Sequence, residues 1–168
     1  MSGAPAGKPL PLGSIGTAVA ANAMTPAELA AFLAEPREAR LATIRADGDI
    51  QLTPVWYLAE TVDDGSIARL LVCLESRRVH LANLRSRPRA TLLVDEDDRP
   101  RGGTAARAAS FRCTVEVVDD EIAVDEARGR LIHRYRGPEA PLPKTPGFRY
   151  SLCILTPEHV TSWDFARA

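Results

Sequence analysis

One stretch of the chain, Arg40–Leu58, constrains the fold more than any other, because it has the pattern of two strands joined by a tight turn. Its first half is short and β-branched at its centre. Asp47 and Gly48 follow, and both tolerate the positive φ angles that a hairpin turn needs. In its second half, alternate side chains fall on opposite faces of a strand. The stretch predicts a β-hairpin, with Pro54 at a bulge or edge because proline cannot donate a ladder hydrogen bond.

The remaining chain adds strands, helices and a tail. Residues 1–23 are rich in Gly, Pro, Ala and Ser and are interpreted as a disordered tail, whereas 24–168 form a single domain. A helix begins after Met24, with Thr25 and Glu28 in a capping box. Further helices are predicted at 76–84, capped by Ser76, and from 119 to 136. Strands are predicted at 40–45, 50–58, 67–74, 89–95, 105–118, 148–155 and 159–165. The set lacks βαβ alternation, so the chain is mainly β (α+β), an antiparallel barrel or sandwich with peripheral helices.

Composition excludes several classes of protein. A formal net charge of −1 on 168 residues gives no electrostatic footprint for nucleic acid. No run of 18 apolar residues is present, so we expect no membrane-spanning segment. The three cysteines, Cys73, Cys113 and Cys153, are widely spaced and odd in number. They are interpreted as buried free thiols of a cytoplasmic protein.

A census of catalytic motifs finds no nucleophile elbow, P-loop or dinucleotide fingerprint, and the three histidines lack metal-ligand spacing. One constellation is more informative. Arg40 and Arg45 bracket the first strand, while Ser76, Arg77 and Arg78 open a helix. Free N–H groups at a helix start and adjacent guanidiniums bind phosphate or another anion. A solvated basic patch explains the same residues equally well.

Five segments carry a recognisable combination of motifs. The segments are Ala39–Thr43 (ARLAT), Asp47-Gly48, Pro54–Tyr57 (PVWY), Asn83–Asp95 (NLRSRPRATLLVD) and Thr156–Phe165 (TPEHVTSWDF). Together they resemble the pyridoxamine 5′-phosphate oxidase-like family, the split β-barrel flavoproteins, and the resemblance covers residues 39–165.

This resemblance implies an antiparallel split β-barrel with flanking helices that works as a homodimer and binds FMN in the dimer groove. It implies an oxidoreductase acting on an unidentified small molecule. The implied cofactor-binding residues are Arg40, Thr43, Arg45, Pro54, Val55, Trp56, Tyr57, Ser76, Arg77, Arg78, His80, Asn83 and Trp163. Many members carry S-x-K before the Asn-Leu pair; here Arg78 takes the serine place and His80 the lysine place. Which of Arg77, Arg78 and His80 contacts the phosphate stays open.

Other functions fit the same pattern. A deazaflavin, coenzyme F-420, could replace FMN, because Pro-Val-Trp hairpins also occur in the deazaflavin-using branch. A haem- or cofactor-binding protein without turnover would use His80 or His133 as the axial ligand. A structural or regulatory dimer would have lost its cofactor. No catalytic side chain is assigned, which is expected where a cofactor carries the redox chemistry.

Overall fold

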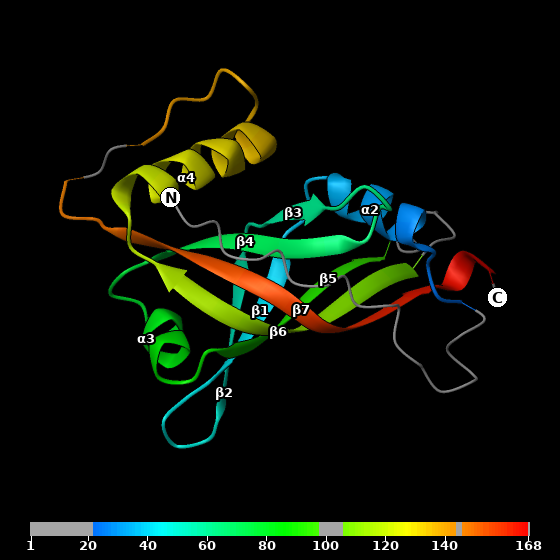
Figure 1. Ribbon diagram of the computed structural model, residues 1–168, viewed down its shortest axis with the longest axis horizontal. Helices are drawn as coiled ribbons and strands as arrows, with labels where there is room; N and C mark the ends of the chain where they lie inside the picture. Colours follow the sequence, from blue (N-terminus) through cyan, green and yellow to red (C-terminus); the bar gives the residue numbers. More distant parts are fainter. Residues whose placement is uncertain (1–21, 98–105, 144–145, 168) are drawn as a thin grey trace.

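The computed structural model describes residues 22–97, 106–143 and 146–167. Within them, seven strands form one antiparallel sheet with three α-helices around it (Figure 1). The helices are α2 (Pro26–Ala34), α3 (Val79–Ser86) and α4 (Glu121–Arg136), and a 3₁₀ turn, η2 (Phe165–Arg167), ends the described chain. The strands are β1 (Ala39–Ile44), β2 (Ile50–Val55), β3 (Leu58–Thr61), β4 (Ile67–Glu75), β5 (Arg89–Asp97), β6 (Ala106–Val118) and β7 (Tyr150–Asp164). The predicted mainly β, antiparallel fold is confirmed.

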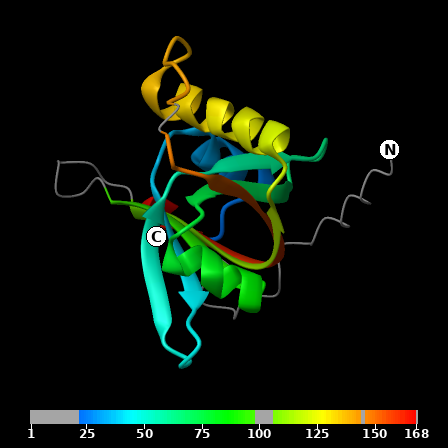
Figure 2. The same ribbon diagram turned by 90° about the vertical axis from the view of Figure 1, so that its left-hand side faces the viewer.

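The two edges of the sheet come from neighbouring parts of the chain. Across the sheet the strands run β2-β1-β5-β6-β7-β4-β3, so the edge strands β2 and β3 are consecutive in sequence and are joined by Trp56 and Tyr57. The sheet curls round on itself (Figure 2), yet within the described residues no ladder joins β2 to β3. A curled sheet whose edges stay unpaired is an open barrel with a split between those edges.

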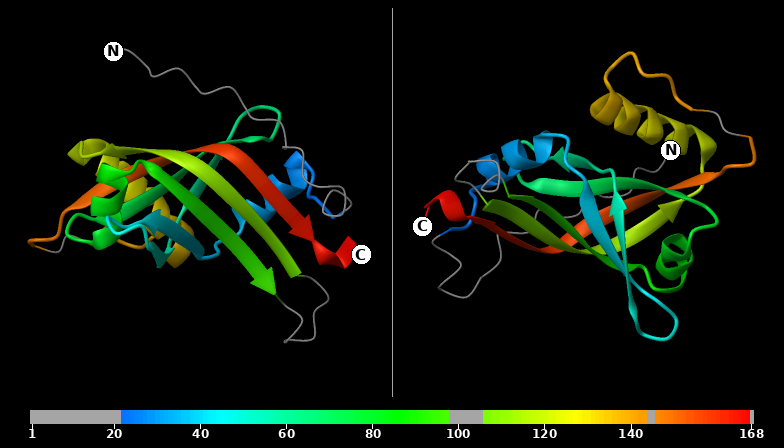
Figure 3. Two further views of the ribbon diagram at one scale, coloured as in Figure 1. Left: turned by 90° about the horizontal axis from the view of Figure 1, so that it is seen from below. Right: turned by 180° about the vertical axis from the view of Figure 1, so that it is seen from behind.

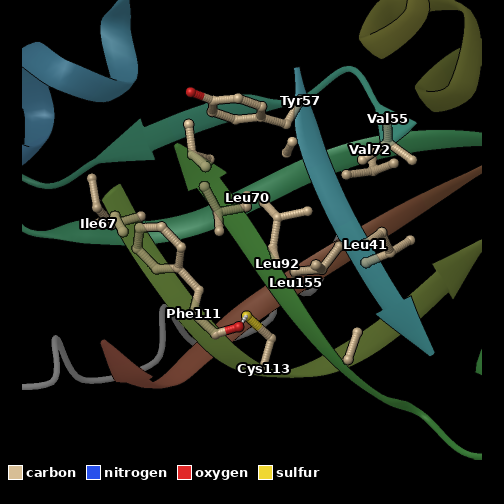
Figure 4. Close-up of a cluster of buried hydrophobic side chains, with 14 of the residues drawn as sticks. Leu41, Val55, Tyr57, Ile67, Leu70, Val72, Leu92, Phe111, Cys113 and Leu155 are labelled. Carbon is tan, nitrogen blue, oxygen red and sulfur yellow. Dashed lines mark hydrogen bonds between the residues drawn. The ribbon is translucent and has the colours of Figure 1, made fainter. Parts of the chain in front are cut away.

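The inward face of the sheet carries the main core (Figure 4). Leu41, Leu92, Phe111 and Leu155 come from four different strands, and all are fully buried. Helix α2 covers one end of the barrel with its own apolar stripe of Leu29, Phe32 and Leu33. Each such side chain contributes about 1.5–3 kcal/mol through burial, so this face fixes the register of the strands.

A second apolar cluster lies on the outward face, where α4 crosses the sheet. Leu71 and Leu152, from β4 and β7, pack against Val124, Ala127 and Leu131 of the helix. Helices α4 and α3 lie on opposite sides of the curled sheet (Figure 3). The packing therefore fixes the C-terminal half of α4 beside the split.

Two local signals in the sequence form as predicted. Thr25 and Glu28 make the reciprocal hydrogen bonds of a capping box at the start of α2. Gly48 takes a φ of 92° in the turn between β1 and β2, a region that side-chain-bearing residues rarely adopt. Of the predicted tail at residues 1–23, all but residues 22 and 23 lies outside the described residues.

The strand prediction is wrong in three places, and one of them is β3, which was not predicted. The strand predicted to end at Leu58 ends at Val55, because the chain there leaves one edge of the sheet and crosses to the other. The two predicted last strands form one continuous strand, β7. Its pairing with β6 shifts so that Arg112 faces His159 and Cys113 faces Pro157. The shift leaves Glu158 as an extra residue, and a bulge of this kind accommodates a proline inside a strand.

Candidate functional site

A cavity of about 690 Å³ occupies the split of the barrel. Its walls come from the edge strand β2, the end of β4, the start of α3 and the second half of α4. The lining includes Thr53, Pro54, Val55, Trp56, Cys73, Glu75, Arg78, Val79, His80, Arg128, Leu131, Ile132, Arg136 and Tyr150. The resemblance-based site and this cavity share Pro54, Val55, Trp56, Arg78 and His80.

Trp56 is held in the wall by Tyr135 of α4. The two rings are stacked, with centroids 4.6 Å apart and planes 4° apart. The Tyr135 hydroxyl donates to the Arg37 carbonyl oxygen at 2.6 Å and accepts from the Tyr57 backbone N–H at 3.2 Å. One side chain therefore ties α4, the start of β1 and the crossing segment together, which fixes the position of the Trp56 ring.

The start of α3 is built differently from the prediction. Ser76 does not cap the helix, which begins at Val79 with Arg78 at the N-cap position and no side-chain cap. The reason is Glu75: its carbonyl accepts the Arg78 N–H at 3.1 Å and its carboxylate accepts the Arg77 N–H at 3.3 Å. These bonds form a turn over residues 75–78, so the helix begins at Val79 and not at residue 76.

Two donors at this helix start have no partner. Among the described residues, the backbone N–H groups of Val79 and His80 have no hydrogen-bond acceptor. Both residues line the cavity. Unsatisfied N–H groups at the positive end of a helix are the donors that proteins use for anions, so this wall fits a phosphate.

Glu75 also controls the charge of the basic helix start. Its carboxylate, 11% exposed, lies 2.8 Å from Nε of Arg77 and 3.1 Å from Nε of Arg78. The hydrogen bond from Arg77 holds the pKa of Glu75 below its ordinary value, against the opposing effect of desolvation. The carboxylate therefore stays charged and shares both guanidiniums with any bound anion.

His80 is a neutral polar group of the cavity near pH 7. Its ring is half-buried, and Nδ1 lies 3.5 Å from Oγ1 of Thr53. Burial and then the charge of Arg78 lower the pKa of His80, while Glu75 acts in the opposite direction. A bound anion would favour the protonated ring, so His80 can gain a proton when an anion binds.

Helix α4 supplies a wall that sequence reasoning missed. Arg128 is fixed there by Asp125 at 3.1 Å, by the Pro143 carbonyl at 2.9 Å and by the Tyr150 ring, whose centroid lies 4.1 Å away. The pattern of α4 predicts a helix, but nothing local indicates that this helix covers the split. Glu75 was also missed, although the sequence could have indicated it, since it directly precedes the basic run Ser76–Arg78.

The cysteines are all free. Cys113 and Cys153 are buried as predicted, whereas Cys73 is half-buried and lines the cavity. Burial raises the pKa of Cys73 to about 12, so it is a neutral thiol. It can pack against a ligand but is not a thiolate nucleophile.

Three predicted site residues have structural partners inside the molecule. Tyr57 is fully buried in the main core, and its hydroxyl donates to the Leu33 carbonyl at 3.3 Å. The Asn83 side-chain amide donates to Oγ1 of Thr43 at 3.0 Å, and both side chains are buried. Within one chain these three side chains position the walls rather than line the cavity.

The remaining predicted residues lie outside the cavity lining. Arg40 is paired with Asp95 at 2.8 Å, and Arg45 donates to the side chain of Gln51 at 3.2 Å. Trp163 lies near the end of β7, opposite Ala108. The others outside the lining are Ser76 and Arg77.

Within residues 22–97, 106–143 and 146–167, no cluster of three or more His, Cys, Asp or Glu side chains could hold a metal ion. None of the helices in the same residues is long and apolar enough to cross a membrane.

Comparison with known proteins identifies the family. The family model of pyridoxamine 5′-phosphate oxidase matches residues 25–164. The chain belongs to the pyridoxamine 5′-phosphate oxidase family. No curated protein matches it by sequence.

Several solved structures share the fold of this chain. The conserved hypothetical protein Rv2991 of Mycobacterium tuberculosis is 26% identical, with a TM-score of 0.71 over 88% of this chain and 89% of that one. An F-420 reductase is 23% identical, with a TM-score of 0.61 over 77% and 93% of the two chains. The haem storage protein HutZ of Vibrio cholerae is 18% identical, with a TM-score of 0.57 over 79% and 90%. The similarity to the last two proteins shows a shared fold alone.

Proposed function

We propose that this member of the pyridoxamine 5′-phosphate oxidase family is an oxidoreductase that binds FMN in the split of the barrel. The observation that carries the proposal is the meeting of two features in one cavity. The uncapped start of α3 supplies Arg78, His80 and two N–H groups that have no acceptor among the described residues, and the end of β2 with the segment after it supplies Pro54, Val55 and Trp56.

The phosphate end of the cofactor fits the start of α3. Arg78 offers a charge-assisted donor, and the N–H groups of Val79 and His80 offer two more. Glu75 orients the Arg78 side chain, and Arg77 shares the same carboxylate. Ser76 and Arg77 precede this group in the chain but lie outside the cavity lining.

The ring end fits the apolar part of the cavity. Pro54, Val55 and Trp56, whose ring is stacked on Tyr135, line this part of the cavity together with Leu131 and Ile132 of α4. These residues hold a planar ring and exclude water from one side of it. When bound, FMN supplies the group that accepts or donates hydride.

We propose further that the protein is a homodimer. Ile44, Ile50 and Leu52 lie on one face of the β1–β2 hairpin, because Ile44 pairs with Ile50 and Ala42 with Leu52 in the ladder. They are 41%, 69% and 59% exposed, a contiguous apolar surface of the kind that subunits bury. Arg40 and Trp163, on the same outer side of the sheet, would reach the cofactor of the partner subunit.

Coenzyme F-420 is the alternative cofactor. The likeness to an F-420 reductase over 93% of that chain supports it, as does the cationic character of the cavity walls. Haem binding without turnover is the third candidate, because His80 lines the cavity and could act as an axial ligand. His133, the other candidate ligand, is exposed on α4 and does not line the cavity.

The test is a titration of the cofactor-free protein with FMN and with coenzyme F-420, beside an absorption spectrum of the protein as purified. We expect one of the two cofactors to bind, and Arg78→Ala to weaken it by about ten- to a hundredfold, the loss of one charge-assisted contact of about 1.5–3 kcal/mol. Arg130→Ala is the matched control, since Arg130 pairs with Glu60 at 2.8 Å and does not line the cavity.

Binding of neither cofactor would contradict the proposal, and a Soret band in the purified protein would favour haem instead. Equal affinity of Arg78→Ala and the unmodified protein would contradict the assigned phosphate end. Light scattering at micromolar concentration tests the dimer, and Leu52→Glu should convert it to a monomer.

A further inference from the structure

The end of the cavity away from α3 carries an arginine that the cofactor assignment does not use. Arg136, in the last turn of α4, lines the cavity beside Trp56. Its guanidinium carbon lies 5.4 Å from the centroid of the Trp56 ring. A guanidinium over an aromatic ring is held in place while its N–H donors stay available.

Arg136 differs from the other arginines of its helix. Arg128 pairs with Asp125, Arg130 pairs with Glu60, and Arg134 donates to the carbonyls of Leu33 and Glu35. Arg136 makes no hydrogen bond or ion pair with any described residue; its contact is with a ring. All five of its N–H donors are therefore open to a ligand.

The charges around the cavity favour an anion at this end. The lining holds three guanidiniums, Arg78, Arg128 and Arg136, against two carboxylates, Glu38 and Glu75. Arg78 is paired with Glu75, and Arg128 is paired with Asp125. Among the described residues Glu38, the remaining carboxylate of the lining, forms no ion pair with Arg136, so Arg136 is the guanidinium of the lining that an anion can pair with.

The surroundings also limit the shape of the ligand. The Trp56 ring cannot move aside, because Tyr135 stacks on it and is itself bonded to the Arg37 carbonyl. Leu131 and Ile132 are apolar neighbours on the same helix wall. A ligand here must present a flat or apolar body to these side chains and an anionic group to the arginine.

We propose that Arg136 and Trp56 form an anion subsite at the α4 end of the cavity, and that the substrate is a planar or apolar small molecule carrying a carboxylate. That this ligand is a substrate rests on the proposed oxidoreductase function, whereas the binding of the anion is independent of it. Arg136 lies in the last turn of α4 and Arg78 at the start of α3, so ligand carboxylate and cofactor phosphate use different arginines.

The experiment compares benzoate with benzamide, which has the same shape without the charge. Dissociation constants are measured by NMR titration of the full-length protein, following the indole N–H signal of Trp56. We expect benzoate to bind at least about tenfold more tightly than benzamide. Arg136→Ala should reduce benzoate to the affinity of benzamide, Arg136→Lys should restore part of the difference, and Arg130→Ala should leave it unchanged.

Equal binding of the two probes, no binding of benzoate, or an unchanged benzoate affinity in Arg136→Ala would each overturn the proposal. A merely structural role for Arg136 at the helix end predicts equal losses for both probes, so the ratio of the two constants separates the roles. FMN affinity is measured on the same variants. If the unmodified protein does not bind FMN but binds benzoate in a way that depends on Arg136, the proposed function is refuted and the anion subsite is not.

Discussion

The two helices that border the cavity, α3 and α4, differ in how completely the protein satisfies their polar groups. Helix α4 is capped by the side chain of Asp120, ends at Gly137 with a φ of 99°, and is tied to the rest of the molecule by Tyr135. Helix α3 starts without a side-chain cap, and within the part of the chain that the structure describes the N–H groups of Val79 and His80 have no acceptor. Groups bonded within the protein serve the scaffold, whereas groups left open beside a cavity are available to a ligand.

The largest expected effect breaks the anchoring of α4. Tyr135→Leu should lower the free energy of unfolding by about 2–3 kcal/mol, because it removes the stacking on Trp56 and leaves the Tyr57 N–H without its acceptor. Tyr135→Phe keeps the ring and should cost about 1 kcal/mol. Urea denaturation measures both.

The matched control on the same helix is Ile122→Ala, since Ile122 is 79% exposed and should change stability by less than about 0.5 kcal/mol. A Tyr135→Leu variant as stable as the unmodified protein would show that α4 is not anchored by this residue.

The open end of α3 should respond to pH. The pKa of His80 lies below its ordinary value of 6.5, so the ring is neutral at pH 8 and gains its proton as the pH falls through the region below 6.5. Because a bound phosphate favours the protonated ring, FMN affinity should rise as the pH is lowered toward that region. His80→Lys carries a permanent charge and should bind FMN up to about tenfold more tightly at pH 8.

The phosphate of FMN also titrates, and it does so equally in both proteins. The ratio of the FMN affinities of the unmodified protein and His80→Lys therefore reports on His80 alone. Parallel pH profiles for the unmodified protein and His80→Lys would place His80 outside the phosphate end.

A third prediction compares the two helix starts directly. Asp120→Ala should cost about 1 kcal/mol of stability, because the Asp120 side chain accepts the Ala123 N–H at 2.9 Å. Ser76→Ala should change stability by less than about 0.5 kcal/mol, because Ser76 caps nothing. Thermal and urea unfolding of both variants decide the matter, and equal losses would show that α3 is capped after all.

The smallest effect concerns the charge shared at α3. Glu75→Gln removes the carboxylate that pairs with Arg77 and Arg78 and should tighten FMN binding by about two- to fivefold. Weaker FMN binding would instead mean that Glu75 is needed to orient the two guanidiniums. A fluorescence titration with FMN distinguishes these outcomes. The ionic strength is held fixed because salt screens exposed ion pairs.

Much of the fold could be predicted because its signals are local. The capping box of Thr25 and Glu28 spans three residues, and the turn at Gly48 depends on one backbone angle. The β-branched centre indicated β1 and alternation indicated β2, whereas the basic run before α3 fitted an anion site and a solvated patch equally well. Of that run, Arg78 lies in the cavity wall and Arg77 does not.

The rest of the site could not be predicted, because it depends on contacts between residues far apart in sequence. Tyr135 and Arg37 are 98 positions apart, and Thr43 and Asn83 are 40 apart. No period or spacing encodes such pairs, so the sequence alone could not show that Tyr57 belongs to the core while Trp56 borders the cavity.

The sequence by itself determined the three helices, most of the strands and the residue types that can hold an anion, because these follow from neighbouring side chains and backbone preferences. Tertiary structure alone decided that the edges β2 and β3 stay apart, that α4 covers the split between them, and that Arg136 has no polar partner among the described residues. The physical reason is that packing of the two apolar clusters sets how the sheet curls and where α4 lies. That placement decides which polar groups are satisfied within the protein and which remain for a ligand.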